Sequence, residues 1–218
     1  MSFSRRHFLV ATAALAGTNR VVQADAPPSL ATPAQVIGPF YPVVRPEESQ
    51  ADLTRVAGQA GRAKGSTVHV TCTVVDPAGR PIAGALVLVW QANAAGRYAH
   101  PRDTSTAPLD PRFLGHVLMR TDRQGQVRFL TIKPGAYADT PGRVRTPHIH
   151  FEVIGEDARL ITQMYFPGEP LNASDRLLQE LAEQRGDPDR LIATRIASDG
   201  GSSAADTALA WTVRLAGA

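Results

Sequence analysis

Two histidines stand two residues apart in the segment Arg145–Phe151, which reads RTPHIHF. In a β-strand, residues i and i+2 point to the same face. His148 and His150 would therefore present two imidazoles side by side, while Ile149 and Phe151 face a core. Such a pair is a suitable beginning for a metal site. The H-x-H spacing alone is weak, because two histidines on one strand face also occur as surface or hydrogen-bonded residues.

The identity of such a metal depends on further ligands. A carboxylate would favour non-haem Fe(II), and a third histidine, a glutamate or a cysteine would favour catalytic zinc. Glu152 shares the strand face of the histidines, but it would lie about 7 Å farther along and could equally be solvated. The other candidate ligands that the sequence offers are two tyrosines. Tyr98 and Tyr137 follow strand-like runs in loops that contain glycine or proline, where a side chain can be directed into a cleft. Tyrosines usually pack with a satisfied hydroxyl, so the residues alone leave the metal open.

The elements that would position these side chains are mostly strands. Residues 66–76 alternate valine with threonine in a period of two, and residues 85–90 form a continuous apolar run suited to a strand covered on both faces. Further strands are expected at residues 115–121, 127–132, 148–154, 160–165 and 208–215. One late helix is expected from Ser174, as its cap, to Arg185, before Gly186. The pattern predicts an all-β fold, a two-sheet β-sandwich with one late helix.

The chain divides into three parts. Residues 1–26 contain the pair Arg5-Arg6, a short apolar run and small residues before position 27, which is the form of a twin-arginine export signal. The apolar run is too short for a stable membrane anchor, so we expect a periplasmic or secreted protein. Residues 27–62 are rich in proline and alanine and predict an extended N-terminal arm on a single domain of residues 63–218.

The composition excludes several classes of protein. The 218 residues are 43% apolar and 20% charged, unlike a disordered chain or a charge-rich coiled coil. Three of the 23 basic residues and one of the 20 acidic residues lie in the first 26, so the remainder is almost neutral and no nucleic-acid partner is expected. The single cysteine, Cys72, cannot form an internal disulfide and alternates with valines, which indicates a core position.

Four motifs in colinear order resemble the intradiol ring-cleavage dioxygenases, and most closely the iron-binding subunits of their protocatechuate-cleaving branch. The motifs are Trp90–Tyr98, Ala107–Pro111, Thr131–Tyr137 and Pro147–Phe151. The likeness begins near Gly38 and runs to Gly168. Four motifs in order are far more specific than any one of them.

The resemblance implies one mononuclear non-haem Fe(III) per chain and a small aromatic diol of the catechol type as substrate. O2 would cleave the ring between its two hydroxylated carbons to give a cis,cis-muconate, with Tyr137 leaving the iron to accept a proton. The residues that the resemblance assigns to iron are Tyr98, Tyr137, His148 and His150, and those that it assigns to the substrate are Arg145, Gln163, Gly38, Pro39 and Tyr41. Two anionic phenolates agree with a ferric ion, because they lower its Lewis acidity and stabilise the higher charge.

The sequence departs from that branch at the pocket wall. Asp139 stands where the protocatechuate enzymes carry a tryptophan, and the stretch between Tyr137 and His148 is shorter than theirs. A carboxylate on the substrate is therefore not assumed, although Arg97 or Arg143 could meet an acidic substituent. The long helical N-terminal region of the catechol 1,2-dioxygenases is absent, so their helical dimer is not expected and a homo-oligomer through other surfaces remains possible.

Two other functions stay open at this point. One is a non-catalytic sandwich that binds a ligand or a cell-surface polymer through its loops. The other is a metal-dependent hydrolase that uses the H-x-H pair with zinc and consumes no oxygen. Oxygen uptake separates both from a dioxygenase.

Overall fold

The structure is a computed structural model that describes residues 31–49, 51–140, 142–197 and 207–216. The expected signal peptide, residues 1–26, lies outside the described residues, as do residues 27–30 of the expected arm. The strands are β1 (Thr67–Val75), β2 (Leu86–Trp90), β3 (His116–Arg120), β4 (Gln126–Ile132), β5 (Tyr137–Thr140), β6 (Arg143–Arg145), β7 (His148–Ile154), β8 (Arg159–Tyr165), β9 (Thr194–Ile196) and β10 (Thr207–Arg214). The helices are the 3₁₀ turns η1 (Pro170–Ser174) and η2 (Pro188–Leu191) and the α-helix α1 (Arg176–Glu183).

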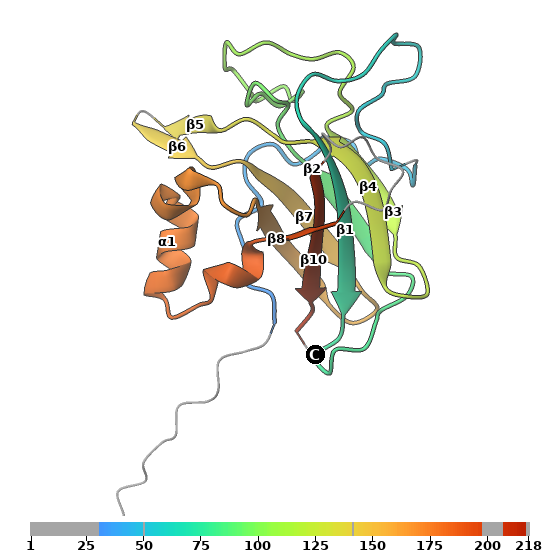
Figure 1. Ribbon diagram of the computed structural model, residues 1–218. Coiled ribbons are helices and arrows are strands. Elements are labelled where there is room, and N and C mark those ends of the chain that lie inside the picture. Colours follow the sequence, from blue (N-terminus) through green and yellow to red (C-terminus); the bar gives the residue numbers. More distant parts are fainter. Residues whose placement is uncertain (1–30, 50, 141, 198–206, 217–218) are drawn as a thin grey trace, which may run out of the picture.

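Two four-stranded sheets form the body of the protein (Figure 1). One has the order β4-β1-β10-β9 and the other β3-β2-β7-β8, and the short hairpin β5-β6 stands apart from both. β1 and β10 pair in parallel, whereas the other pairs are antiparallel. This arrangement confirms the predicted all-β sandwich, and all seven predicted strands are present within a residue or two of their expected limits.

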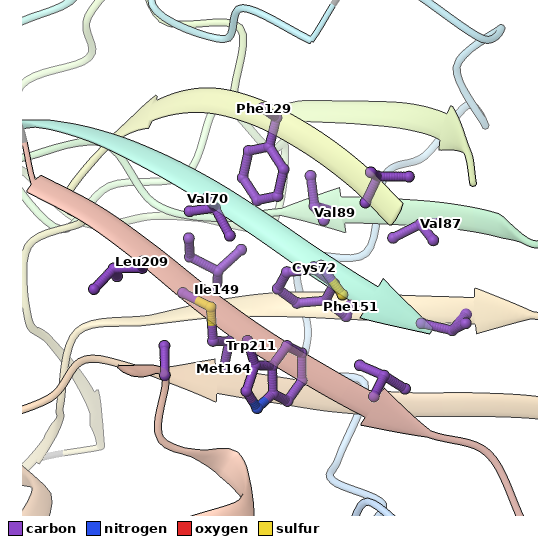
Figure 2. Packing of buried hydrophobic residues seen from close by; sticks show 14 of the residues in the cluster. Val70, Cys72, Val87, Val89, Phe129, Ile149, Phe151, Met164, Leu209 and Trp211 are labelled. Atoms are coloured by element: carbon purple, nitrogen blue, oxygen red, sulfur yellow. The ribbon is translucent and has the colours of Figure 1, made fainter. Parts of the chain in front are cut away.

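The main core lies between the two sheets (Figure 2). Alternate residues of β1, among them Val70 and Cys72, meet inward side chains of the opposite sheet such as Val89 and Phe151. This follows from the period of two along each strand. Cys72 is completely buried, and burial raises the pKa of its thiol to about 12, so it behaves as a small core residue.

Three strands and both ends of the helix differ from the sequence-based prediction. β5, β6 and β9 are three or four residues long and mostly exposed, so they carry no hydrophobic alternation that a sequence could reveal. The helix cap is Asp175 and not Ser174, because the Asp175 side chain accepts hydrogen bonds from the first turn while Ser174 Oγ donates to the carbonyl of Leu171.

The end of α1 is also displaced from the predicted glycine. Arg185 has a φ of 59°, and its N–H donates to the carbonyl of Ala182, while the N–H of Gly186 donates to the carbonyl of Leu181. These two bonds form a Schellman motif in which the left-handed position falls on arginine. A side chain at Gly186 would still be crowded, because a Cβ there would lie 2.9 Å from the backbone carbonyl oxygen of Leu181.

The described part of the N-terminal arm, residues 31–49 and 51–62, contacts both sheets of the sandwich. Isolated bridges pair it with one edge strand of each sheet, Glu48 with Leu118 of β3 and Asp52 with Leu130 of β4. Leu53 then enters the main core and is fully buried. The arm thereby covers backbone groups that an uncovered edge would expose. No helix in the described ranges is long and apolar enough to span a membrane.

Candidate metal centre

The candidate site lies on the outer face of the β3-β2-β7-β8 sheet. Along β7, Ile149 and Phe151 point into the main core, as predicted, and His148 and His150 point to the other side. That outer face carries a second buried cluster of Leu88, Trp90, Ala92, Tyr98 and Leu118, against which Phe40, Tyr41 and Tyr137 pack. Arm and loops therefore cover the histidines, whose side chains are only 2% and 1% exposed.

Four polar side chains converge under this cover. The Nε2 atoms of His148 and His150 are 3.2 Å apart, and the hydroxyl of Tyr137 lies 3.3 Å from His148 Nε2. The ring of Tyr98 lies 5.5 Å from that of Tyr137 and 6.3 Å from that of His150, between centroids. The structure thus brings together the four residues that the sequence analysis assigned to iron.

The loops that deliver the two tyrosines are packed against each other. Gly96, two residues before Tyr98, has a φ of 77°, and a Cβ at this position would lie 2.4 Å from the carbonyl oxygen of Ala136. The N–H of Gly135 donates to the carbonyl of Asn93 at 2.9 Å. Because neither glycine has a side chain, the two loops approach closely enough to fix both phenols.

The polar atoms of the two histidines and the two tyrosines fit a metal cation. His148 Nδ1 lies 2.6 Å from the carbonyl of Thr146, which only accepts, so Nδ1 carries the proton and Nε2 presents a lone pair. Within the part of the chain that the structure describes, the buried hydroxyl of Tyr98 and Nδ1 of His150 have no hydrogen-bond partner. Burying a phenol hydroxyl without a partner costs free energy of folding. A cation bound between the phenols and the imidazoles would give this oxygen a partner.

Burial also sets the protonation of these groups. Desolvation, and next the positive charge of Arg145, lower the pKa of His148 to about 3, and burial holds the pKa of His150 well below its usual value. Burial raises the pKa of Tyr98 and that of Tyr137. At neutral pH the imidazoles are therefore neutral, as ligands must be, and the phenols ionise only when a cation stabilises their anions.

Arg145 lies beside the cluster in a buried hydrogen-bond network. Its Nε donates to Asp175 Oδ2 at 2.8 Å, and its Nη2 donates to Gln163 Oε1 at 2.7 Å and to the hydroxyl of Tyr165 at 3.1 Å. Gln163 in turn donates through Nε2 to the carbonyl of Val36 in the arm at 3.0 Å. Arg145 is 6% exposed, so it is not part of a surface ion pair.

The arm residues assigned to the substrate occupy different positions. Gly38 lies against the imidazole, since a Cβ on it would be 3.1 Å from His150 Cε1. Pro39 is exposed. Tyr41 packs edge-on against Trp90, and its hydroxyl donates to Glu152 Oε2 at 2.8 Å.

Glu152 is neither solvated nor directed at the cluster. Its side chain is 1% exposed and is paired with Arg159, Arg45 and the hydroxyl of Tyr41. Within the described ranges, no three imidazole, carboxylate or thiol side chains come together in a way that could hold a metal. The ligand sets of a non-haem Fe(II) centre or a catalytic zinc site are therefore not completed by Glu152, and the tyrosines are the remaining donors.

Of the arginines considered for an acidic substituent, Arg143 lies on the exposed β5-β6 hairpin together with Asp139. Arg97 donates through Nη1 to the carbonyl of Ala107 at 2.6 Å and so stabilises its own loop.

Sequence reasoning missed three residues of the site. Phe40 stacks on Tyr98 with 4.5 Å between ring centroids, and its place between Pro39 and Tyr41, which the resemblance assigns to the substrate, was the available signal. Tyr165, two residues after Gln163, shares its strand face and could have been found by the period of two. Asp175 lies 30 residues from Arg145, and no local pattern connects the two.

Fold and site together define a two-sheet β-sandwich with a buried cluster of two histidines and two tyrosines on the outer face of one sheet. The sequence model of a family described as "Dioxygenase" matches residues 36–217 of the chain. The chain belongs to this dioxygenase family, among the intradiol ring-cleavage dioxygenases.

Individual relatives support this placement. The protocatechuate 3,4-dioxygenase beta chain of Burkholderia cepacia is 50% identical over 145 residues, which cover 65% of this chain and 61% of the relative. Hydroxyquinol 1,2-dioxygenase of Corynebacterium glutamicum is 32% identical over 176 residues, which cover 70% of this chain and 54% of that relative. The match thus spans only about half to three-fifths of the length of these curated relatives.

Solved structures share the fold. The dioxygenase domain of a dioxygenase carbohydrate-binding protein fusion from Streptomyces sp. SirexAA-E superposes with a TM-score of 0.62 at 28% identity, covering 86% of this chain and 99% of that domain. The 3-chlorocatechol 1,2-dioxygenase of Rhodococcus opacus 1CP has a TM-score of 0.66 at 23% identity, and the match covers 86% of this chain and 73% of that chain. This similarity is one of fold.

Proposed function

We propose that this protein is a non-haem Fe(III) intradiol dioxygenase that opens the ring of a catechol-type diol with O2 to give a cis,cis-muconate. The observation that carries the proposal is the buried cluster of two phenols and two imidazoles, in which the Tyr98 hydroxyl has no hydrogen-bond partner among the described residues. Phenolate donors favour a ferric ion over Fe(II) or zinc. Relatives named for protocatechuate and hydroxyquinol cleavage support the same reaction class.

Tyr98, Tyr137, His148 and His150 would hold the iron. When bound, ferric iron supplies a Lewis acid that a catechol can chelate, which activates the ring toward O2. The two phenols differ in their surroundings, because Tyr98 is 4% exposed under Phe40 whereas Tyr137 is half-buried at the start of β5. Tyr137 is therefore the phenol that can move and accept a substrate proton at its oxygen.

Arg145 would stabilise negative charge that develops on the substrate. The guanidinium is permanently charged, buried and fixed in one plane by its partners, so its charge acts in a site of low dielectric. Phe40 and Gly38 lie directly over Tyr98 and His150 and exclude water from that side of the cluster.

Neither Arg97 nor Arg143 is a buried cation aimed at the cluster, so the substrate in this proposal is recognised by its diol and its ring. A panel of catechol, protocatechuate, hydroxyquinol and homoprotocatechuate, followed by oxygen uptake and product mass, identifies the preferred ring.

Ferric loading tests the proposal directly. The purified protein should acquire a visible tyrosinate-to-iron charge-transfer band, and the band should weaken in the Tyr98→Phe variant because one phenolate is lost. A colourless loaded protein would overturn the proposal. Zinc-dependent hydrolysis without oxygen uptake, or ligand binding that persists in a Tyr98→Phe, His148→Ala protein, would instead support one of the two other functions.

We also infer export by the twin-arginine route, on the basis of Arg5-Arg6 and the apolar run that follows. Replacing both arginines by lysine should leave the protein in the cytoplasm of a bacterial host, whereas a periplasmic double variant would contradict this inference. A homo-oligomer is a separate proposal, which light scattering of the purified protein tests.

A further inference from the structure

Asp175 lies where α1 meets the candidate metal centre. Its side chain is completely buried. One carboxylate oxygen, Oδ1, accepts from the backbone N–H groups of Leu177 and Leu178 at 3.0 and 3.4 Å, as the cap of α1. The other, Oδ2, accepts from Arg145 Nε at 2.8 Å and from the N–H of Thr146 at 3.2 Å. One carboxylate thus joins the helix to the two residues that lead into β7.

The first branch of this junction ends at the guanidinium of Arg145. Asp175 holds Nε, and Gln163 and Tyr165 hold Nη2, so two of the three nitrogens are engaged in a fixed plane. Nη1 has no hydrogen-bond partner among the residues that the structure describes, and it is the nitrogen left to face a ligand. Removing the bond to Nε would let the group rotate about its side-chain torsions.

The second branch ends at His148. The N–H of Thr146 is held by Asp175, and the carbonyl of the same residue accepts from His148 Nδ1 at 2.6 Å. Thr146 Oγ1 also donates to Asn172 Oδ1 at 2.9 Å. The orientation of the imidazole thus depends on the backbone of Thr146, which Asp175 restrains from the side of α1.

A helix cap alone does not explain a buried carboxylate here. Asparagine and serine cap helices about as well as aspartate, without the desolvation of a charge. What the carboxylate adds is a charged acceptor for Arg145. We infer that Asp175 is a positioning residue that orients the Arg145 guanidinium toward the substrate and, through Thr146, the His148 imidazole toward the metal. The Arg145 branch rests on the proposed function, whereas the His148 branch requires only that the cluster bind a metal.

The variant Asp175→Asn tests both branches, because asparagine keeps the cap but cannot accept both bonds to Oδ2 while accepting those to Oδ1. Asp187→Asn is the matched control. Asp187 caps η2 by accepting from the N–H of Asp189 and pairs with an arginine, but its side chain is 57% exposed.

The first readout is retention of ferric iron against a competing chelator, which does not depend on turnover. The chelator concentration that removes half of the iron should fall by about tenfold to a hundredfold in Asp175→Asn and remain unchanged in Asp187→Asn. Equal retention in all three proteins would overturn the His148 branch.

The second readout is the kinetics of catechol-dependent oxygen uptake. Asp175→Asn should lower kcat by about tenfold or more with a smaller change in KM. In a double-mutant cycle, its further effect on kcat per bound iron should be small in an Arg145→Met background, because its effect on turnover of the iron-loaded protein acts through Arg145. A variant with only a lower melting temperature and a normal kcat would assign Asp175 a purely structural role and overturn the Arg145 branch.

Two further outcomes are distinguishable. If the wild-type protein retains iron but consumes no oxygen with any catechol, the proposed function fails while chelator competition still decides the His148 branch. If Asp175→Asn does not fold, the wild type and the double variant Arg145→Met/Asp175→Asn form the pair that replaces it, since removing both charges of a buried pair is milder than removing one. Equal iron retention in that pair would contradict the role of Asp175.

Discussion

At the scale of single residues, the site combines groups that are neutral and poorly partnered without a metal. The buried Tyr98 hydroxyl and His150 Nδ1 have no hydrogen-bond partners in the described ranges, whereas His148 is oriented by the carbonyl of Thr146. Each unpartnered group costs free energy of folding. The protein therefore stores part of its metal affinity as unsatisfied polar atoms in the metal-free state.

The substitution Tyr98→Phe should leave the metal-free protein as stable as the wild type, or more stable, because it removes a hydroxyl that has no partner. Tyr165→Phe is the control, since its hydroxyl binds Arg145 and Gln163, and it should lower the free energy of unfolding by about 1–2 kcal/mol. Denaturant melts of both metal-free variants measure the difference. A Tyr98→Phe protein that loses as much stability as Tyr165→Phe would show that the hydroxyl is partnered.

The stability of the metal-free protein should fall as the pH drops below about 6.5. Burial lowers the pKa of His148 to about 3 and holds the pKa of His150 far below its usual value, so near pH 5 the unfolded chain binds protons that the folded protein does not. The imidazole contribution is complete above the unfolded pKa and is lost as the pH falls toward the folded pKa. Burial lowers the pKa of His116 in the same direction.

Urea melts between pH 8 and about 4.5 measure this slope before most carboxylates titrate. A His148→Gln, His150→Gln variant should have a flatter profile than the wild type, and His116→Gln should keep most of the slope. A wild-type profile that is flat from pH 7 to 5 would contradict neutral, buried imidazoles.

At the scale of elements, strand alternation explains what the sequence could predict. The period of two in β7 places both histidines on one face and Ile149 and Phe151 on the other, as the structure shows. The hairpin β5-β6 and strand β9 escaped prediction because their residues are exposed and do not alternate. The contact of Arg145 with the cap of α1 also escaped prediction, because it depends on tertiary packing and not on a local spacing of residues.

The arm should be held over the site by Glu152, which binds Tyr41, Arg45 and Arg159. Glu152→Gln weakens the two contacts of this buried carboxylate with the arm, the hydrogen bond from Tyr41 and the ion pair with Arg45, and a hydrogen bond to a charged group is worth about 1.5–3 kcal/mol. Thermolysin should therefore cleave near the exposed residues Val43 and Val44 at least about tenfold faster in this variant, because cleavage requires local release of the arm.

Glu48→Gln provides the control, because Glu48 binds Arg120 with both side chains about half exposed. Its cleavage rate should stay within about twofold of the wild type. Equal acceleration by both substitutions would show that the arm is not anchored through Glu152.

At the scale of the whole molecule, the sandwich serves as a rigid support whose outer sheet face carries the site. The arm first covers His150 at Gly38 and then pairs with one edge strand of each sheet, so one segment both encloses the site and covers part of each sheet edge. Hydrophobic periodicity was sufficient to predict the sandwich and its main core. The enclosure could not be predicted in this way, because the arm has no regular pattern and its position depends on contacts with distant residues such as Gln163 and Glu152.

The most direct test of the central claim is the fate of isotopically labelled O2 with the iron-loaded protein and the catechol that it prefers. Intradiol cleavage on this site predicts a ring-opened diacid that carries both labelled oxygen atoms, and no product in a His148→Ala protein. Product that contains no labelled oxygen, or oxygen uptake without ring opening, would contradict the account.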